Sequence, residues 1–188
     1  MSGRVLLIAF LFLVTLAIPV TYGDTLWDGG GDGESWEDEL NWNGNAIPTD
    51  QDAARINGGN IAVIDSDSGS QTCGYLQIGH VIWGLATGAT VNIENGGSLE
   101  VVNSTEVGAG TDGSNSYLNV NGAAIRTEGS FRIGANRSGL AGVGRTYVNI
   151  TNGAVVSAAA SKNGKLNNPS VDTYGEINIH NGTLQIDN

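Results

Sequence analysis

Val91-Asn92-Ile93-Glu94-Asn95-Gly96 is the stretch that decides the fold of this chain, because its pattern returns three more times. Similar segments start at Leu118, Val148 and Ile177, so that successive starts are 27, 30 and 29 residues apart. Apolar and polar residues alternate in each segment, which is the period of a half-buried β-strand. The Asn-Gly pair at the end suits a sharp corner, since both residues tolerate positive φ angles. A strand that returns at this interval indicates stacked repeats.

Each repeat contains two further short strands. One follows the Asn-Gly corner, at 99–101, 125–127, 155–157 and 184–186, and the other ends in glycine, at 76–79, 105–108 and 131–134. The segment 57–64 aligns with 95–102 and predicts an earlier copy of the second strand. An Asn-Gly pair between two strands can also close a hairpin, but the regular return favours corners of a solenoid.

These patterns predict an all-β chain that folds as a right-handed parallel β-helix. Residues 53–188 are expected to form about five coils, of which the last is incomplete. The right hand follows from the general preference of parallel crossover connections. A single coil cannot bury its apolar side chains alone, so the coils must stack on their neighbours.

The stacking predicts which outward side chains meet on successive coils. Glu100 is expected above Arg126, and Glu106 above Arg132, and both pairs have opposite charges. An outward ladder of side-chain amides is predicted from Asn92, Asn119, Asn149 and Asn178. A structural role is the simpler interpretation of this ladder, and an array that binds a ligand is the alternative.

A segment rich in Trp, Gly and Asp, at 24–52, precedes the repeats. It contains Trp27, Trp36 and Trp42, and we expect these rings to cap the apolar end of the solenoid, since terminal coils need closing. Exposed Trp rings could also stack on sugar rings, so the three residues are candidate carbohydrate-binding residues as well.

The same segment contains an acidic loop that partly matches a calcium-binding loop. Asp28, Asp32 and Glu39 stand at positions 1, 5 and 12 of an EF-hand pattern, with Gly33 at position 6. Position 3 is Gly30 rather than Asp or Asn, and no helix is predicted on either side. A calcium site is therefore one hypothesis, and a plain Gly-Asp turn is the other.

The first 23 residues have the features of a signal peptide. Arg4 precedes an apolar run at 5–20, and small residues at 21 and 23 suit the cleavage site. The apolar run is too short for a typical membrane span, and no later segment is expected to cross a bilayer. The net charge of −11 disfavours nucleic acid as a partner, because phosphates would be repelled.

No catalytic constellation is evident in the sequence. His80 and His180 are far apart, and no spacing typical of zinc ligands, phosphate loops or serine nucleophiles is present. The single cysteine, Cys73, precedes apolar residues and is expected to be a small buried residue. We therefore expect a non-catalytic chain, and a polysaccharide-degrading β-helix is the alternative.

The chain also resembles a known class of proteins. The run from Trp27 to Gly44 and the Asn-Gly-Gly and Ile-Gly repeats are similar to exported β-strand-repeat proteins of planctomycete-type bacteria, with sorting-signal or autotransporter-associated repeats. This resemblance implies a parallel β-helix at the cell surface with a structural or adhesive role.

Several expectations about localisation, partners and function follow from these observations. They are secretion or surface localisation, extracellular polysaccharide or cell-envelope components as partners, and carbohydrate binding as the alternative function. Because the last repeat is incomplete at Asn188, the solenoid is expected to be truncated there and to associate end to end if that coil is open.

Overall fold

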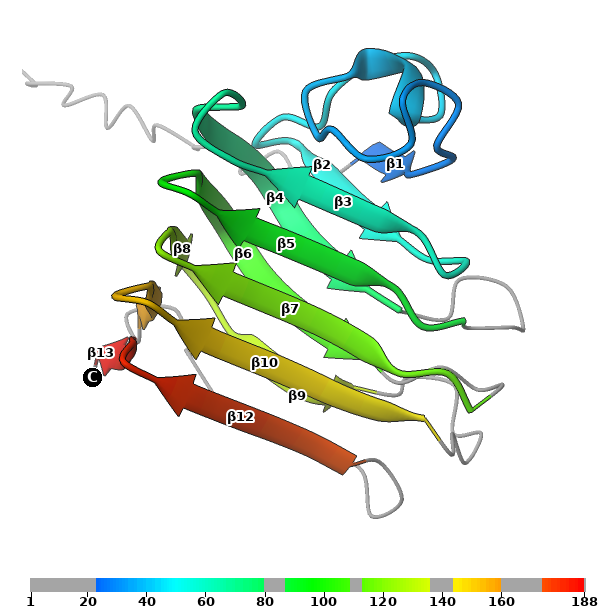
Figure 1. Cartoon of the computed structure of the whole chain (residues 1–188). Helices are drawn as coiled ribbons and strands as arrows, with labels where there is room; N and C mark the ends of the chain where they lie inside the picture. The colour runs from blue at the N-terminus through cyan, green and yellow to red at the C-terminus, as the bar shows by residue number, and fades with distance from the viewer. Residues whose placement is uncertain (1–22, 80–86, 109–112, 136–143, 160–173, 188) are drawn as a thin grey trace, which may run out of the picture.

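The computed structural model describes residues 23–79, 87–108, 113–135, 144–159 and 174–187. Within them the chain is all-β and winds as a parallel β-solenoid of about four turns without an α-helix (Figure 1). The only helical element described is a 3-10 turn, η1 (Glu39–Asn41). The strands are β1 (Gly23–Leu26), β2 (Asp52–Ile56), β3 (Ile61–Ile64), β4 (Ser70–Ile78), β5 (Thr90–Glu94), β6 (Ser98–Gly108), β7 (Ser116–Asn121), β8 (Ala124–Thr127), β9 (Phe131–Ala135), β10 (Arg145–Thr151), β11 (Val155–Ala159), β12 (Tyr174–His180) and β13 (Thr183–Asp187).

The strands form two sheets. One has the order β12-β10-β7-β5-β3, and the other has the order β1-β2-β4-β6-β8-β11-β13, with β9 beside β6. Every pair of strands that the structure describes is parallel. A hairpin would pair its two strands antiparallel, so the Asn-Gly pairs are corners of a solenoid, as predicted.

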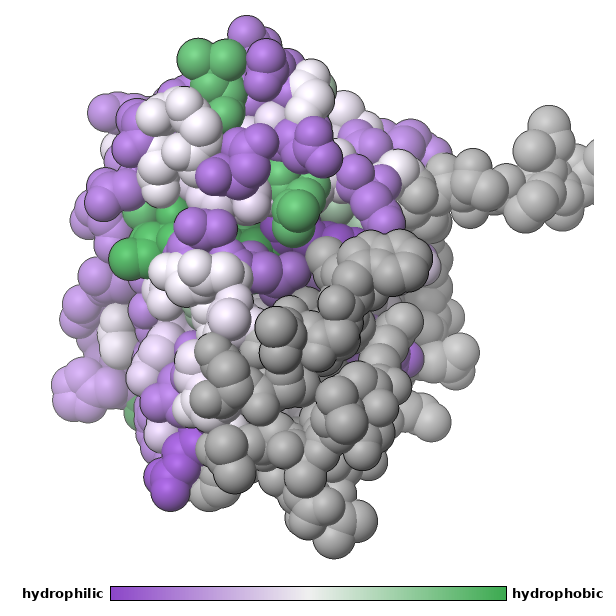
Figure 2. All heavy atoms as spheres, turned by 90° about the vertical axis from the view of Figure 1, so that its right-hand side faces the viewer, coloured by the Kyte–Doolittle hydropathy of each residue, from purple (hydrophilic) through white to green (hydrophobic). Residues whose placement is uncertain are grey.

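The outer surface is mostly polar. Among the described residues, the exposed large hydrophobic side chains are Leu40, Ile61, Val155 and Ile179. Figure 2 shows one side of the molecule, where green apolar patches lie isolated among hydrophilic side chains. This distribution fits a core that lies inside the coil.

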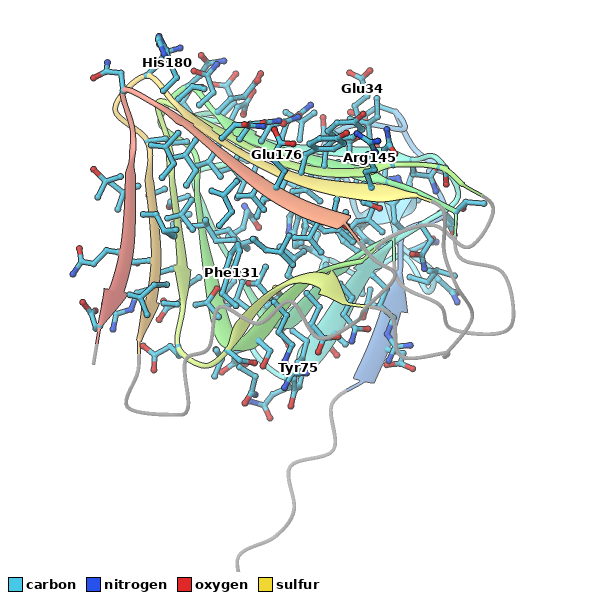
Figure 3. All side chains as sticks on the ribbon, turned by 90° about the horizontal axis from the view of Figure 1, so that it is seen from below. Glu34, Tyr75, Phe131, Arg145, Glu176 and His180 are labelled. Atoms are coloured by element: carbon cyan, nitrogen blue, oxygen red, sulfur yellow. The ribbon has the colours of Figure 1, made fainter. Side chains whose placement is uncertain are left out.

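The solenoid has three faces, because β4 and β6 each bend and contribute to two of them (Figure 3). The register between β4 and β6 shifts between Cys73 and Tyr75. The first parts of these strands form one face with β8, β11 and β13, and their second parts form another face with β2 and β9. The five-stranded sheet is the third face.

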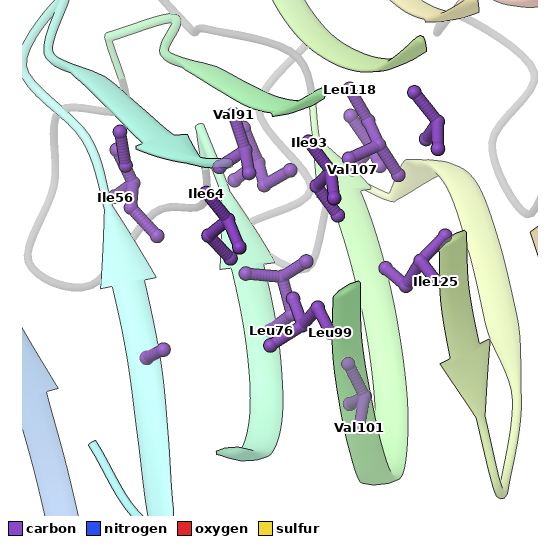
Figure 4. Close-up of a cluster of buried hydrophobic side chains, with 14 of the residues drawn as sticks. Ile56, Ile64, Leu76, Val91, Ile93, Leu99, Val101, Val107, Leu118 and Ile125 are labelled. Carbon is purple, nitrogen blue, oxygen red and sulfur yellow. The ribbon is translucent and has the colours of Figure 1, made fainter. Parts of the chain in front are cut away.

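The core consists of columns of apolar side chains that stack from coil to coil. Val91 lies beside Leu118, and Ile93 beside Val120, and all four are buried. In Figure 4, side chains from both sheets converge on the space between them. Their alternation with outward polar residues is the pattern that predicted the strands.

Cys73 belongs to this core and is fully buried beside Val101. Burial raises the pKa of the Cys73 thiol, because the thiolate would lose its hydration. The prediction of a small buried residue is confirmed.

The corners have the backbone conformation that the sequence predicted. Asn95, Asn152 and Asn181 have φ angles of 52°, 55° and 54°, and Gly122 occupies the equivalent corner with a φ of 58°. Asn and Gly reach this left-handed region at lower cost than other residues.

One detail of the predicted coil division was wrong. Ile61 pairs with Thr90, so the strand at 61–64 is the first strand of its coil and not a copy of 99–102. The strand that follows this corner is the first part of β4, which pairs with β6 from Ser98 onward. The predicted alignment would place Ile61 and Val63 inside, whereas the structure buries Ala62 and Ile64 and leaves Ile61 exposed. All four residues are apolar, so alternation alone could not choose between the two alignments.

The number of coils is close to the prediction of about five coils with an incomplete last one. The strands β2, β4, β6 and β9 begin about four turns, and β12 and β13 follow as a partial turn.

Candidate functional site

The segment before the repeats closes the first coil with three tryptophans. The rings of Trp27 and Trp42 meet edge to face at 4.9 Å, and those of Trp36 and Trp42 at 4.7 Å. β1 pairs with β2, and a bridge joins Ser35 to Val63 on β3, so the segment covers the first strand of both sheets. The predicted capping module is confirmed.

The burial of these rings bears on their second predicted role. Trp27, Trp36 and Trp42 are 2%, 0% and 0% exposed. Sugar stacking requires one open ring face, and in this conformation none of the three rings presents one. Carbohydrate binding by these tryptophans therefore stays a prediction that requires the cap to open.

The acidic loop of the cap (28–38) is organised by a residue that the sequence did not single out. The buried Asn41 accepts hydrogen bonds at Oδ1 from the N–H groups of Gly31 and Gly33, at 3.0 and 2.8 Å. Its Nδ2 donates to Asp32 Oδ1 at 2.7 Å and to the Ser35 carbonyl at 2.9 Å. No local signal separates Asn41 from the many other Asn residues of the chain.

The carboxylate of Asp32 is held by several donors. Its Oδ1 also accepts from the backbone N–H groups of Glu34 and Ser35, at 2.9 and 2.8 Å. Hydrogen bonds from the Ser35 side chain, the Glu34 backbone and the Asn41 amide lower the pKa of Asp32 well below its usual range. Protein donors thus surround Oδ1 of Asp32.

The calcium site at Asp28, Asp32 and Glu39 stays a prediction. Asp28 Oδ1 accepts from the Gly30 N–H at 3.0 Å, and Glu39 begins η1 as an exposed side chain. Among the described residues, no group of three or more Asp, Glu, His and Cys side chains is close enough to hold a metal ion. With Asp32 bonded to N–H groups, the donor set resembles the plain acidic turn that was the other hypothesis.

The predicted amide ladder lies on the outer side of the five-stranded sheet, which we call the ladder face. Asn119 Nδ2 donates to Asn92 Oδ1 at 2.8 Å, and Asn149 Nδ2 donates to Asn119 Oδ1 at 2.7 Å. Asn178 Nδ2 then donates to Asn149 Oδ1 at 3.0 Å. The ladder therefore crosses four strands, β5, β7, β10 and β12, and confirms the predicted register.

Two outward rows flank the ladder on the same face. In one row the rings of Tyr117 and Tyr147 stack at 5.1 Å with planes 11° apart. In the other row Thr151 Oγ1 donates to Asn121 Oδ1 at 3.3 Å. The stacked rings face each other along the solenoid axis, so their edges point outward. This tyrosine stack was not predicted, although Tyr117 and Tyr147 occupy equivalent positions of successive coils and the register that gave the ladder also places them side by side.

The charged side chains of this face lie mainly toward one end. In Figure 3 Arg145, Glu176 and His180 project from the outer side of the five-stranded sheet. Glu176 and His180 belong to β12, the last strand of this sheet, and Arg145 is the first residue of β10. The strands β5, β7 and β10 between β3 and β12 present mostly neutral groups.

The two predicted charge pairs have different outcomes. Arg132 Nη1 lies 2.7 Å from Glu106 Oε1, and Glu106 is fully buried. Gln77 Nε2 donates to the other oxygen of Glu106 at 3.2 Å. Arg126 lies beside Glu100 as predicted, but the ion pair it forms is with Glu128, at 3.2 Å.

No described part of the chain brings together groups of the kind used in catalysis. His180 is exposed on β12, Cys73 is buried, and His80 lies outside the described residues, as does the predicted signal sequence up to residue 22. The expectation of a non-catalytic chain therefore stays a prediction.

Comparison with known proteins adds no relative. No protein-family model, curated protein or solved structure matches the chain. In the described residues we find no helix that is both long and apolar enough to cross a membrane.

Proposed function

We propose that this chain is an exported solenoid with a structural or adhesive role at the cell surface or in the extracellular space. The observation that carries the proposal is the repetition of one chemical group along one face. The amides of Asn92, Asn119, Asn149 and Asn178 are linked coil after coil.

Repetition of this kind favours adhesion over catalysis. An active site needs a few different groups that converge on one reacting centre. A ladder instead offers equal groups in a line, so that many weak contacts with a repetitive partner add up to strong attachment. Export is supported by the signal-peptide pattern at 1–23 and by the resemblance of the sequence to exported repeat proteins.

The proposal is tested by expressing the complete chain in a Gram-negative host. We expect the protein outside the cytoplasm with Asp24 as its first residue, measured by N-terminal sequencing of the exported fraction. The purified protein should then co-sediment with bacterial cell envelopes and release no reducing or unsaturated ends from polysaccharides. A chain that stays in the cytoplasm with residues 1–23 attached, or one that releases such ends, would contradict the proposal.

A further inference from the structure

The ladder face combines three properties that together point to one class of ligand. It is regular, it is polar, and its middle is nearly free of charge. Each property rests on the register of three strands, β5, β7 and β10, which lie side by side between β3 and β12.

The regularity comes from aligned outward rows. Nine outward positions are aligned on the three strands, in the rows Thr90-Tyr117-Tyr147, Asn92-Asn119-Asn149 and Glu94-Asn121-Thr151. Neighbouring strands in a sheet are about 4.8 Å apart, and residues on one side of a strand are about 7 Å apart. The face is therefore a grid, and Figure 1 looks directly onto it.

The polarity of the grid leaves hydrogen-bonding capacity toward solvent. Each amide nitrogen carries two N–H groups, and each amide oxygen has two lone pairs. Asn119 uses one N–H to reach Asn92, and its oxygen accepts one bond from Asn149. The second N–H and the second lone pair are directed away from the ladder bond, and the same geometry recurs on Asn149.

The charge of the grid contrasts with that of the whole chain. The chain has a net charge of −11, yet only Glu94 is charged among the nine aligned positions. The other positions are neutral and include the hydroxyl groups of Tyr117 and Thr151. The Tyr117 hydroxyl accepts a hydrogen bond from Asn115 at 3.2 Å. An acidic protein with a neutral amide and hydroxyl surface repels polyanions but accepts a neutral polyhydroxyl ligand.

We infer that the ladder face binds a neutral, linear polysaccharide that lies along the solenoid axis. The direction follows from the rows, because the same amide recurs only from coil to coil. A polymer with hydroxyls at every unit can contact several amides at once, and this multiplies weak contacts. The inference rests on the proposed adhesive function and names its ligand and its surface.

The test measures co-sedimentation of the mature chain, residues 24–188, with cellulose, chitin and carboxymethylated cellulose. We expect binding to at least one of the two neutral polymers and much weaker binding to the carboxylated one. If cell envelopes sediment the protein but neither neutral polymer does, the ligand class is wrong while the adhesive function stands. Stronger binding to the carboxylated polymer would also overturn the inference.

Two variants and a matched control locate the surface. Thr151→Glu places a charge on the ladder face, and Ser157→Glu places the same charge on the outer side of β11 in the same coil. We expect about tenfold weaker polysaccharide binding for Thr151→Glu and unchanged binding for Ser157→Glu. Tyr117→Phe, which keeps the ring stack and removes one hydroxyl, should weaken binding several-fold. If all three variants bind as the parent does, or if the two Glu variants lose binding equally, the ladder face is not the binding surface.

Discussion

Asn41 is the residue on which the conformation of the acidic loop depends. Its side chain is completely buried and takes part in four hydrogen bonds, two at each polar atom. An amide has room for about four such bonds, so the side chain uses its whole capacity.

Replacing this amide should destabilise the cap. We expect Asn41→Ala to lower the free energy of unfolding by about 2–3 kcal/mol, because buried N–H and C=O partners lose their hydrogen bonds. The measurement is denaturant unfolding followed by the fluorescence of the buried tryptophans. Asn43→Ala, two residues further on and exposed, is the control. Equal stability of the two variants would show that the loop does not depend on Asn41.

The carboxylate of Asp32 makes the cap sensitive to acid. Its pKa is lowered in the folded state, whereas an unfolded Asp has a pKa of about 3.9. The ionised group therefore stabilises the folded state at neutral pH, and this contribution is lost as the pH falls below about 4.

The sign of this effect gives a second prediction. Asp32→Asn should melt at a lower temperature than the parent at pH 7, and the difference should shrink when both are measured near pH 3. Asp50→Asn, on the exposed loop before β2, serves as the comparison. A difference that stays the same at both pH values would rule out ionisation of Asp32 as its origin.

Among the strands, β6 and β9 share the buried ion pair of Glu106 and Arg132. Glu106 is fully buried, while the side chain of Arg132 is 35% exposed. Removing the arginine leaves a buried carboxylate with fewer partners, whereas removing the charge of Glu106 leaves an arginine that water can reach.

Two substitutions separate these effects. Arg132→Met is expected to cost about 3 kcal/mol of stability, in line with broken buried pairs. Glu106→Gln should cost less, since the amide oxygen can still accept from Arg132 and its NH2 group can donate to the Oε1 atom of Gln77, which is buried without a hydrogen-bond partner among the described residues. Chemical denaturation of both variants provides the comparison. A larger loss of stability for Glu106→Gln than for Arg132→Met would mean that Arg132 does little to stabilise the buried carboxylate.

The amide ladder links β5, β7, β10 and β12 beyond their backbone hydrogen bonds. Asn149 makes two ladder bonds and the terminal Asn178 makes one. With about 1 kcal/mol for each bond, Asn149→Ala should lower stability by about 2 kcal/mol and Asn178→Ala by about 1 kcal/mol. Thermal unfolding of the two variants checks the ratio. Identical losses would argue against additive ladder bonds.

At the scale of the whole molecule, the two ends of the described solenoid differ. The cap covers the first coil, whereas β12 and β13 each have one neighbouring strand in the part of the chain described. Ile179 on β12 is 51% exposed, and Leu184 and Ile186 are partly buried. Strand edges of this kind favour pairing with another chain.

We therefore predict that residues 24–188 associate at high concentration through this end. Sedimentation velocity should show a concentration-dependent dimer, and Ile179→Lys should weaken it. Val155→Lys changes another exposed apolar side chain on β11, a strand that lies between β8 and β13 and not at the end of the solenoid. This variant should leave the dimer intact. If the parent chain stays monomeric at all concentrations, the prediction that this end is an interaction surface is wrong.

The sequence by itself determined the repeat, the strands, the corners and much of the register. Apolar alternation, Asn and Gly at the corners, and equal residues one repeat apart are local properties that can be read along the chain. They predicted the Asn92-Asn119-Asn149 ladder and the pair of Glu106 with Arg132, both of which the structure contains.

Only the tertiary structure decided which strand of a coil the segment 61–64 forms, and which side chains are enclosed. Residues 61–64 are all apolar and show no alternation, so only the pairing of Ile61 with Thr90 assigned this strand. The roles of Asn41, Gln77 and the stacked Tyr117 and Tyr147 likewise depend on contacts that the fold creates. The physical reason is that a contact between residues at unrelated positions, such as Asn41 with Gly31, has no signal in the sequence, whereas strand period, corner conformation and equal positions of successive repeats do.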